Sequence, residues 1–399
     1  MKFSALVDRI RGDGADAWNT HHEAAQARAR GEDVIVLSVG DPLIETPSAV
    51  IDRAIERLRA GDTHYIPAAG RLALREAIAR AHAVRTQQVT RAENVIALSG
   101  TQNALFTASL CVAGPGDEVI SFDPMYPTYT ATIEVSGARM VRARQPAQRG
   151  FRPDLENLAS LITPRTRAIF YATPNNPSGV VLNESELAAI GDIAERHNLW
   201  IVADEVYAGL APGGRVPSLA ARLPEQVITV SSLSKSHAMP GWRSGWLVGS
   251  PQMVAHAESL AMCMLFGLSG FIQEAAIVAL ADAAEAERRM RDYCQVRREL
   301  MTRALQGANG IRLHAPDVGM FMLADVRDTG LSGREFMHAL YESQRVSVLD
   351  GGAFGRETEG FVRVCFATDE VTIAEASRRI RRFLEDRLTG ASRKRRAAR

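Results

Sequence analysis

Short apolar runs alternate with helix-length segments between about residue 48 and residue 285. Near-continuous apolar runs bounded by turn residues are typical of strands in a mostly parallel sheet that is covered on both faces. The runs occupy residues 95–99, 118–121, 168–171, 200–203, 227–230 and 245–249. The pattern therefore predicts an α/β fold in which a central sheet lies between helices.

The pattern changes after this region. Residues 279–306 form a charged segment with the period of one long helix, and strand-like runs follow at 320–323, 346–349 and 361–365. We expect these elements and the N-terminal arm to form a smaller α+β domain. The predicted divisions are an arm with part of the small domain (1–47), a large domain (48–285), a small domain (286–390) and a solvated, disordered basic tail (391–399).

Composition excludes several classes of protein. Lys and Arg number 47 and Asp and Glu 46, so net charge gives no basis for binding nucleic acid or an anionic membrane. The four cysteines form no Cys-x-x-Cys pair, and the nine histidines form no His-Glu-x-x-His motif, so no metal site is expected. The start of the chain is charged and the longest apolar run is interrupted by glycines, so we expect neither a signal peptide nor a membrane span. A soluble, cytoplasmic protein is predicted.

Lysine usage singles out one residue. Only Lys2, Lys235 and Lys394 are lysines, and Lys235 alone is internal. It follows a predicted strand that ends in Ser232 and Ser234, and Arg243 lies eight residues further on, beside glycines. Hydroxyls and a guanidinium suit a phosphate, and a partly desolvated amine near cations is a nucleophile that forms Schiff bases. Taken alone, the segment also fits a solvent-facing lysine in a Ser-rich turn.

Three further motifs follow predicted strands. Asp204 places a carboxylate at a strand end, where α/β folds bind ligands and where a protonated ring nitrogen would be a suitable partner. Asn176 lies in a turn, and Gly100, Thr101 and Gln102 lead from a strand into a helix whose N-terminus suits a phosphate. Separately, these motifs also fit a helix cap, an Asn-Pro turn and a helix start. Their combination and order indicate a ligand site.

These motifs resemble the class I/II aminotransferases of fold type I, which use pyridoxal phosphate. The resemblance covers essentially the whole chain, from residues 37–42 to residues 362–364. It implies a mostly parallel seven-stranded sheet in the large domain. It also implies that Lys235 binds the cofactor aldehyde, that Asp204 pairs with the ring nitrogen, and that Tyr207 and Asn176 contact the ring hydroxyl oxygen.

The resemblance assigns the other contacts as well. Tyr126 matches an aromatic residue that stacks on the cofactor ring, and Arg363 and Gly40 match the contacts of the substrate carboxylate. The residues that match the phosphate site are Gly100, Thr101, Gln102, Ser232, Ser234 and Arg243. Tyr65 resembles a tyrosine that reaches the phosphate from a neighbouring subunit, which implies a homodimer with shared sites.

Several segments resemble one subgroup, the arginine–pyruvate transaminases; they are residues 12–18, 61–65, 234–242, 260–267 and 346–349. The chain departs from the wider family at residues 42–47, where Leu43 and Ile44 replace an Asp-aromatic pair. Glu45 and Asp16 are candidates for receiving a guanidinium, although both fit surface charges equally well. For His237 we expect a positioning or packing role.

The resemblance implies a ping-pong aminotransferase that takes arginine and pyruvate, with Lys235 moving the substrate Cα proton. Alternatives are an aminotransferase for aspartate, aromatic or other neutral amino acids, and a lyase or decarboxylase on the same scaffold. A non-catalytic sensor that binds pyridoxal phosphate is a third possibility. The sequence offers no basic helix-turn-helix extension for a sensor, and all the catalytic positions are filled.

Overall fold

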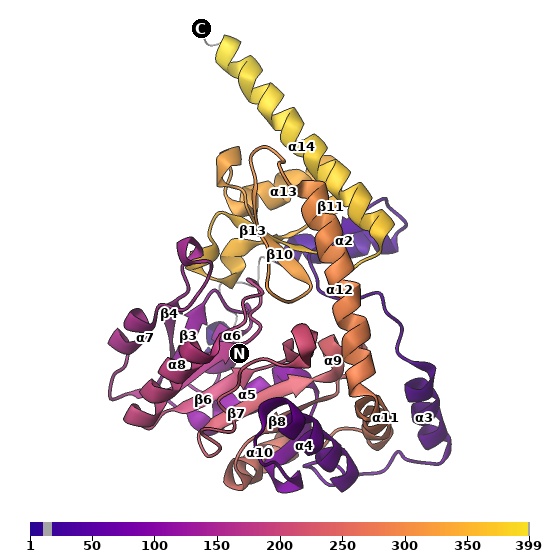
Figure 1. Ribbon diagram of the computed structural model, residues 1–399, viewed down its shortest axis with the longest axis vertical. Helices are drawn as coiled ribbons and strands as arrows, with labels where there is room; N and C mark the ends of the chain where they lie inside the picture. The colour runs from indigo at the N-terminus through magenta and orange to yellow at the C-terminus, as the bar shows by residue number, and fades with distance from the viewer. Residues whose placement is uncertain (11–17, 398–399) are drawn as a thin grey trace.

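The central element of the fold is a seven-stranded sheet with strand order β2-β8-β7-β6-β5-β3-β4 (Figure 1). The computed structural model describes residues 1–10 and 18–397, with side chains up to residue 387. The strands are β2 (Val95–Leu98), β3 (Glu118–Asp123), β4 (Arg139–Arg144), β5 (Thr166–Ala172), β6 (Trp200–Asp204), β7 (Val227–Ser232) and β8 (Gly245–Val248). All neighbours are parallel except β8, which is antiparallel to β2 and β7. The expected α/β fold with a mostly parallel sheet is confirmed.

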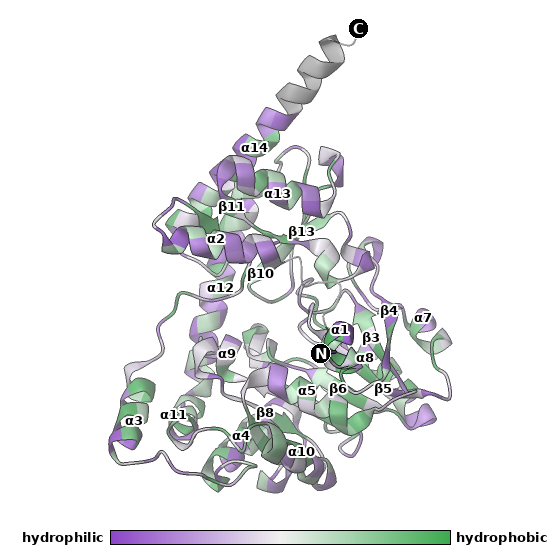
Figure 2. Ribbon diagram, turned by 180° about the vertical axis from the view of Figure 1, so that it is seen from behind, coloured by the Kyte–Doolittle hydropathy of each residue, from purple (hydrophilic) through white to green (hydrophobic). Residues whose placement is uncertain are grey.

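Alternate residues of each strand point to opposite faces of the sheet. Val202 of β6 packs with α5 and α10, whereas Ile201 packs with α7 and α8. A third cluster joins the β2 and β8 end of the sheet to α3, α4 and α11. Apolar residues accordingly concentrate in the strands and in the helices against them (Figure 2). The helices of this part are α3 (Ser48–Arg59), α4 (Leu72–Thr86), α5 (Gly100–Val112), α6 (Tyr129–Glu134), α7 (Leu155–Ser160), α8 (Glu184–His197), α9 (Leu233–Ser236), α10 (Pro251–Met264) and α11 (Gly270–Ala281).

A second core surrounds a four-stranded sheet of order β12-β13-β10-β9. Beside it, β1 pairs with β11 in parallel, which ties the N-terminal arm to the C-terminal part. The helix α12 runs between the two parts of the molecule (Figure 1). The elements are α1 (Ala5–Arg9), α2 (Asn19–Ala29), β1 (Ile35–Val36), α12 (Ala283–Leu305), β9 (Arg312–His314), β10 (Phe321–Asp325), α13 (Gly333–Gln344), β11 (Val346–Ser347), β12 (Leu349–Asp350), β13 (Phe361–Cys365) and α14 (Glu370–Ala397).

Four local features differ from the sequence prediction. The helix expected over 279–306 is interrupted at Asp282, whose backbone leaves the helical region (φ −118°, ψ 32°). The run at 346–349 forms two short strands with different partners. The edge strand β4 was not predicted, because arginines interrupt its apolar pattern. The backbone of α14 is helical to Ala397, so most of the expected disordered tail continues a helix rich in helix-forming residues.

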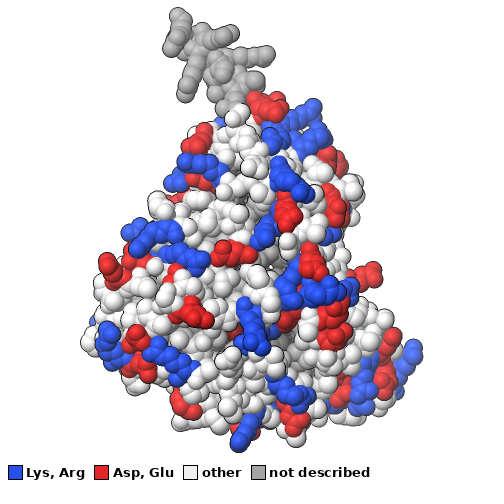
Figure 3. Space-filling view, viewed as in Figure 1, with Lys and Arg blue, Asp and Glu red and all other residues white. Residues whose placement is uncertain are grey.

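Surface charge is mixed, as the near-zero net charge implies. Blue and red side chains alternate over the visible face without a continuous patch of either sign (Figure 3). Within the described parts of the chain, none of the helices combines the length and the hydropathy needed to cross a bilayer.

Candidate active site

A cavity of about 280 Å³ opens where the parallel strands end. This is the edge at which α/β sheets bind ligands, because the loops after the strands converge there. The expected site residues line the cavity, except Tyr65 and Gly100. Those that line it are Gly40, Thr101, Gln102, Tyr126, Asn176, Asp204, Tyr207, Ser232, Ser234, Lys235, Arg243 and Arg363.

One end of the cavity is built from hydrogen-bond donors. The helix α5 begins at Gly100, directly after β2, and points its N-terminus toward this end. Thr101 Oγ1 donates to Ser232 Oγ over 2.9 Å. A Cβ at Gly100 would lie 2.3 Å from Arg243 Nη2, and φ is +82° there, so only glycine lets the guanidinium approach so closely. The arrangement suits a phosphate.

Lys235 lies on the short helix α9, immediately after β7. Its Nζ donates to the carbonyl oxygen of Gly40 over 2.7 Å, so the amine bridges the large sheet and the N-terminal arm. Burial lowers the pKa of Lys235 below its ordinary value, and the charges of Arg363 and Arg243 act in the same direction. The charged form of the amine is therefore less favoured here than in water, which makes the amine a better nucleophile.

Asp204 ends β6 and is 7% exposed. Its carboxylate accepts a hydrogen bond from the Tyr129 hydroxyl over 2.6 Å and one from the Val206 backbone N–H over 3.0 Å. Burial raises the pKa of Asp204 to about 6, and both hydrogen bonds oppose that rise. The carboxylate is thus oriented by two donors, and a cationic partner in the cavity would stabilise its charged form.

Arg363 lies in the middle of β13 and is only 2% exposed. Its guanidinium lies between the rings of Phe321 and Phe354, 4.7 and 4.8 Å from their centroids. Two of its nitrogens donate to Asn176 Oδ1 (2.9 Å) and to the Ser38 carbonyl (2.7 Å), whereas its buried Nε has no hydrogen-bond partner among the residues that the structure describes. A buried cation with unused donor capacity is suited to a carboxylate ligand.

A second carboxylate holds the loop that carries Phe354. Asp123, at the end of β3, accepts hydrogen bonds from the backbone N–H groups of Arg356 and Glu357 at 3.0 and 3.2 Å. A Cβ at Gly355 would lie 2.0 Å from Asp123 Oδ1, which explains the glycine at this contact. Asp123 therefore keeps this loop, and the ring stacked on Arg363, against the large sheet.

Sequence reasoning missed the residues that orient the catalytic groups. Tyr129, Trp18 and the two phenylalanines around Arg363 belong to the site, but no motif distinguished them from core aromatics. The available signal was that Tyr129, the first residue of α6, follows the predicted site residue Tyr126 by only three positions.

Four other residues lie outside the cavity or outside the described chain. His237 is buried beyond the lysine, and its Nδ1 lies 2.8 Å from Ser236 Oγ. Tyr65 is 85% exposed, and its ring lies against that of Phe266 at an angle of 55°, with the ring centroids 4.8 Å apart. Glu45 is exposed, and Asp16 falls outside the described residues.

The lining residues fit pyridoxal phosphate group by group. The α5 N-terminus, the hydroxyls and Arg243 offer donors to a phosphate, and Asp204 offers a carboxylate to a ring nitrogen. The Lys235 amine lines the same cavity as these two groups. In the described residues, no cluster of His, Cys, Asp or Glu has the makings of a metal site.

Comparison with known proteins gives the same family. The family described as aminotransferase class I and II matches residues 32–380. An arginine–pyruvate transaminase of Pseudomonas aeruginosa is 42% identical over 95% of this chain and 97% of its own length. An aspartate aminotransferase of Pyrococcus horikoshii is 33% identical over 91% of this chain and 94% of its own. The structure of a Thermus thermophilus aspartate aminotransferase with maleate has a TM-score of 0.91 and 29% identity, covering 96% of this chain and all of that one. The chain therefore belongs to the class I and II aminotransferases and is an enzyme that uses pyridoxal 5'-phosphate to exchange amino groups between amino acids and 2-oxo acids.

Proposed function

We propose that this enzyme transfers the α-amino group of arginine to pyruvate. The observation that carries the substrate proposal is the 42% identity to an arginine–pyruvate transaminase over nearly the whole of both chains. Two features of the cavity support it. Arg243 lies at the phosphate end and Arg363 suits the α-carboxylate, so the described lining offers no further cation to an acidic side chain such as that of aspartate. Trp18 contributes an aromatic face, on which a guanidinium stacks favourably.

We assign the central chemistry to Lys235. Pyridoxal phosphate, when bound, withdraws electrons from the substrate Cα. The Lys235 amine holds the cofactor aldehyde before the substrate arrives and afterwards takes the Cα proton. Its lowered pKa means that a larger share of this amine than of an exposed lysine is free to accept that proton. Because the amino group is received in one half-reaction and delivered in the other, ping-pong kinetics follow.

The remaining cofactor contacts follow from the chemistry of the lining groups. Thr101, Ser232, Ser234 and Arg243 donate to the phosphate, with the backbone of Gly100 and the side chain of Gln102 at the same end. Tyr126 stacks on the ring from one side. Tyr207 and the Asn176 amide donate to the ring hydroxyl oxygen. Asn176 has a second function, because its Oδ1 accepts from Arg363 and links the cofactor site to the carboxylate site.

The Arg363 assignment has a testable consequence. Arg363→Leu removes a pair of charge-assisted hydrogen bonds to the α-carboxylate that every substrate carries. We expect KM to rise by about 100-fold for amino donors and 2-oxo acceptors alike. The half-saturating concentration of cofactor should change little. Steady-state kinetics with two donors and two acceptors measure this, and Arg312→Leu on the exposed edge of β9 is the control. A KM effect confined to one substrate would contradict the assignment.

We also propose that the enzyme is a homodimer in which Tyr65 contacts the phosphate in the partner subunit. The 85% exposure of Tyr65 supports this assignment, since a tyrosine outside its own cavity is available to a neighbour. The free cysteines are consistent with a reducing compartment, and we place the enzyme in the cytoplasm.

A panel of amino donors tests the proposed reaction. Each donor is mixed with pyruvate or 2-oxoglutarate, and formation of the donor's 2-oxo acid is measured. We expect arginine with pyruvate to give the highest kcat/KM. A preference for aspartate or aromatic donors would replace the substrate proposal, and release of ammonia or carbon dioxide without an acceptor would favour a lyase or decarboxylase.

A further inference from the structure

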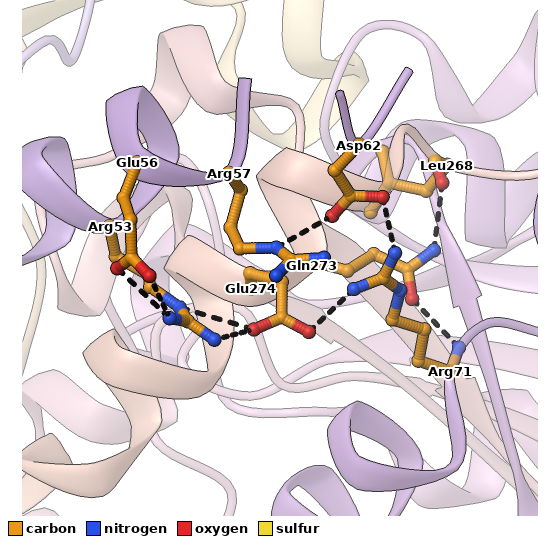
Figure 4. A network of polar contacts seen from close by, with 8 residues as sticks. All are labelled: Arg53, Glu56, Arg57, Asp62, Arg71, Leu268, Gln273 and Glu274. Carbon is orange, nitrogen blue, oxygen red and sulfur yellow. Dashed lines mark hydrogen bonds and ion pairs between the residues drawn. The ribbon is translucent and has the colours of Figure 1, made fainter. Parts of the chain in front are cut away.

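A network of charged side chains includes Asp62, which lies three positions before the exposed Tyr65 in the chain (Figure 4). Asp62 accepts hydrogen bonds from Arg57 and Arg71, and the Arg57 contact is 3.2 Å long. Arg71 Nη1 also donates to Glu274 over 2.6 Å, and Glu274 in turn pairs with Arg53. We call this group, together with Gln273, the Asp62 network; the exposed Glu56 pairs with its Arg53 from outside. It joins α3, the segment before α4, and α11.

The Asp62 network holds two separate loop segments. Asp62 itself belongs to residues 61–66, the segment that carries Tyr65. Gln273 binds the second segment, residues 265–269, because its Nε2 donates to the Leu268 carbonyl over 2.7 Å. Its Oε1 accepts from the Arg71 backbone N–H over 2.8 Å. A Cβ at Gly270 would lie 2.5 Å from Asp62 Oδ1, so the two segments are packed closely at the network.

The two segments present an apolar surface. The rings of Tyr65 and Phe266 are in contact at an angle of 55°, and the segments line an open hollow of about 550 Å³ that is separate from the cavity of this chain. Phe266 is 47% exposed. Ile51, Ile55 and Leu58 are exposed at helical spacing on α3, which the network also joins. Exposed apolar groups on this scale are typical of an interface. We infer that a second copy of this chain covers this apolar surface, because the exposed Tyr65 is the residue proposed to contact the partner's cofactor.

We propose that the Asp62 network positions the Tyr65 and Phe266 segments so that they complete the cofactor site of the partner subunit. The inference rests on the proposed dimer with shared sites. Asp62, Arg71, Gln273 and Glu274 act as positioning residues in trans: they affect cofactor binding in the partner's cavity and leave their own cavity unchanged.

Hybrid dimers separate effects in trans from effects in cis. Lys235→Ala on one chain leaves one site with a reactive lysine, and Tyr65 of that site comes from the Lys235→Ala chain. Asp62→Asn is placed either on the Lys235→Ala chain or on the other chain. The amount of cofactor fixed to Lys235 by borohydride, measured by mass spectrometry at a series of cofactor concentrations, reports this site alone. Transamination activity at the same concentrations is the second readout.

We expect about tenfold weaker cofactor binding when Asp62→Asn is on the Lys235→Ala chain, and binding near that of the unsubstituted hybrid when it is on the other chain. Glu56→Gln is the matched control, because Glu56 pairs with the same network through Arg53 yet its side chain is 62% exposed. Glu274→Gln replaces Asp62→Asn if the latter does not assemble.

Tyr65→Phe, placed on the Lys235→Ala chain or on the other chain, separates the proposal of a shared site from the proposal that the Asp62 network positions it. If Tyr65→Phe acts only in trans while Asp62→Asn acts equally in both arrangements or in neither, the shared site stands and the positioning role is overturned. If Tyr65→Phe acts in cis or has no effect, the shared site itself is wrong, and the inference about the network is overturned with it.

Discussion

Replacing Lys235 with alanine is expected to abolish transamination, with turnover reduced by at least about 10⁴-fold, the upper range for a single positioned proton-transfer group. The reason is that one amine performs two tasks: it holds the cofactor aldehyde and then moves the substrate Cα proton. No other lysine can substitute, because Lys2 and Lys394 lie at the two ends of the chain. Single-turnover kinetics with preloaded cofactor measure the loss in the chemical step.

The controls for this prediction use the scarcity of lysine. Lys2→Ala and Lys394→Ala should retain full activity. Lys235→Arg keeps a cation in the cavity but offers no base, since a guanidinium stays protonated, so it should be as inactive as the alanine variant. Borohydride should fix the cofactor to a peptide containing residue 235 in the unsubstituted enzyme and in the Lys2→Ala and Lys394→Ala controls, but in neither Lys235 variant. Steady-state turnover by Lys235→Ala would refute the assignment of the base.

The strand framework and the cavity residues that end its strands were accessible from sequence for the same physical reason, whereas other cavity residues, such as Tyr126 and Arg363, were assigned from the resemblance to the family. Parallel strands that are buried on both faces are apolar along their whole length, so β5, β6 and β7 can be recognised in the sequence as runs of apolar residues. The polar residue that ends such a run then faces the ligand edge of the sheet, as Asp204 does. The edge strand β4 is partly exposed to solvent, and its arginines interrupt the apolar pattern by which a strand is recognised in the sequence.

The groups that support the cavity residues were not accessible, because their partners are distant in sequence. Tyr129 reaches Asp204 across 75 positions, and Arg363 reaches the Ser38 carbonyl across 325. In the sequence Phe354 cannot be told from any other apolar residue, and only the fold shows that Arg363 of β13 lies against its ring. Such contacts depend on the packing of one part of the molecule on the other, and the hydrophobic periodicity of a single helix or strand does not predict them. The Asp62 network is of the same kind, since α3 and α11 supply its opposing charges.

The charge of Asp204 should matter second only to Lys235. Asp204→Asn keeps the size of the side chain and its hydrogen bond from Val206, but it leaves a cationic ring nitrogen without a carboxylate. Breaking one partner of a buried pair costs about 3–5 kcal/mol, which is roughly 10²–10⁴-fold. We expect a loss of this size, shared between cofactor affinity and kcat, measured by cofactor titration and by turnover at saturating cofactor.

The pH dependence gives this prediction a signature that misfolding would not produce. In the cofactor-free protein burial raises the pKa of Asp204 to about 6, so the carboxylate is mostly ionised at pH 7 and becomes protonated as the pH falls through 6. Cofactor must then displace that proton, and the affinity advantage over Asp204→Asn should shrink by about tenfold per pH unit below this point. Tyr129→Phe removes a hydrogen bond that lowers the pKa of Asp204. In the Tyr129→Phe background, the advantage in cofactor affinity of Asp204 over the Asp204→Asn variant should therefore begin to shrink at a higher pH. An advantage of constant size from pH 5 to pH 8, or wild-type turnover by Asp204→Asn, would show that the carboxylate does not pair with the ring.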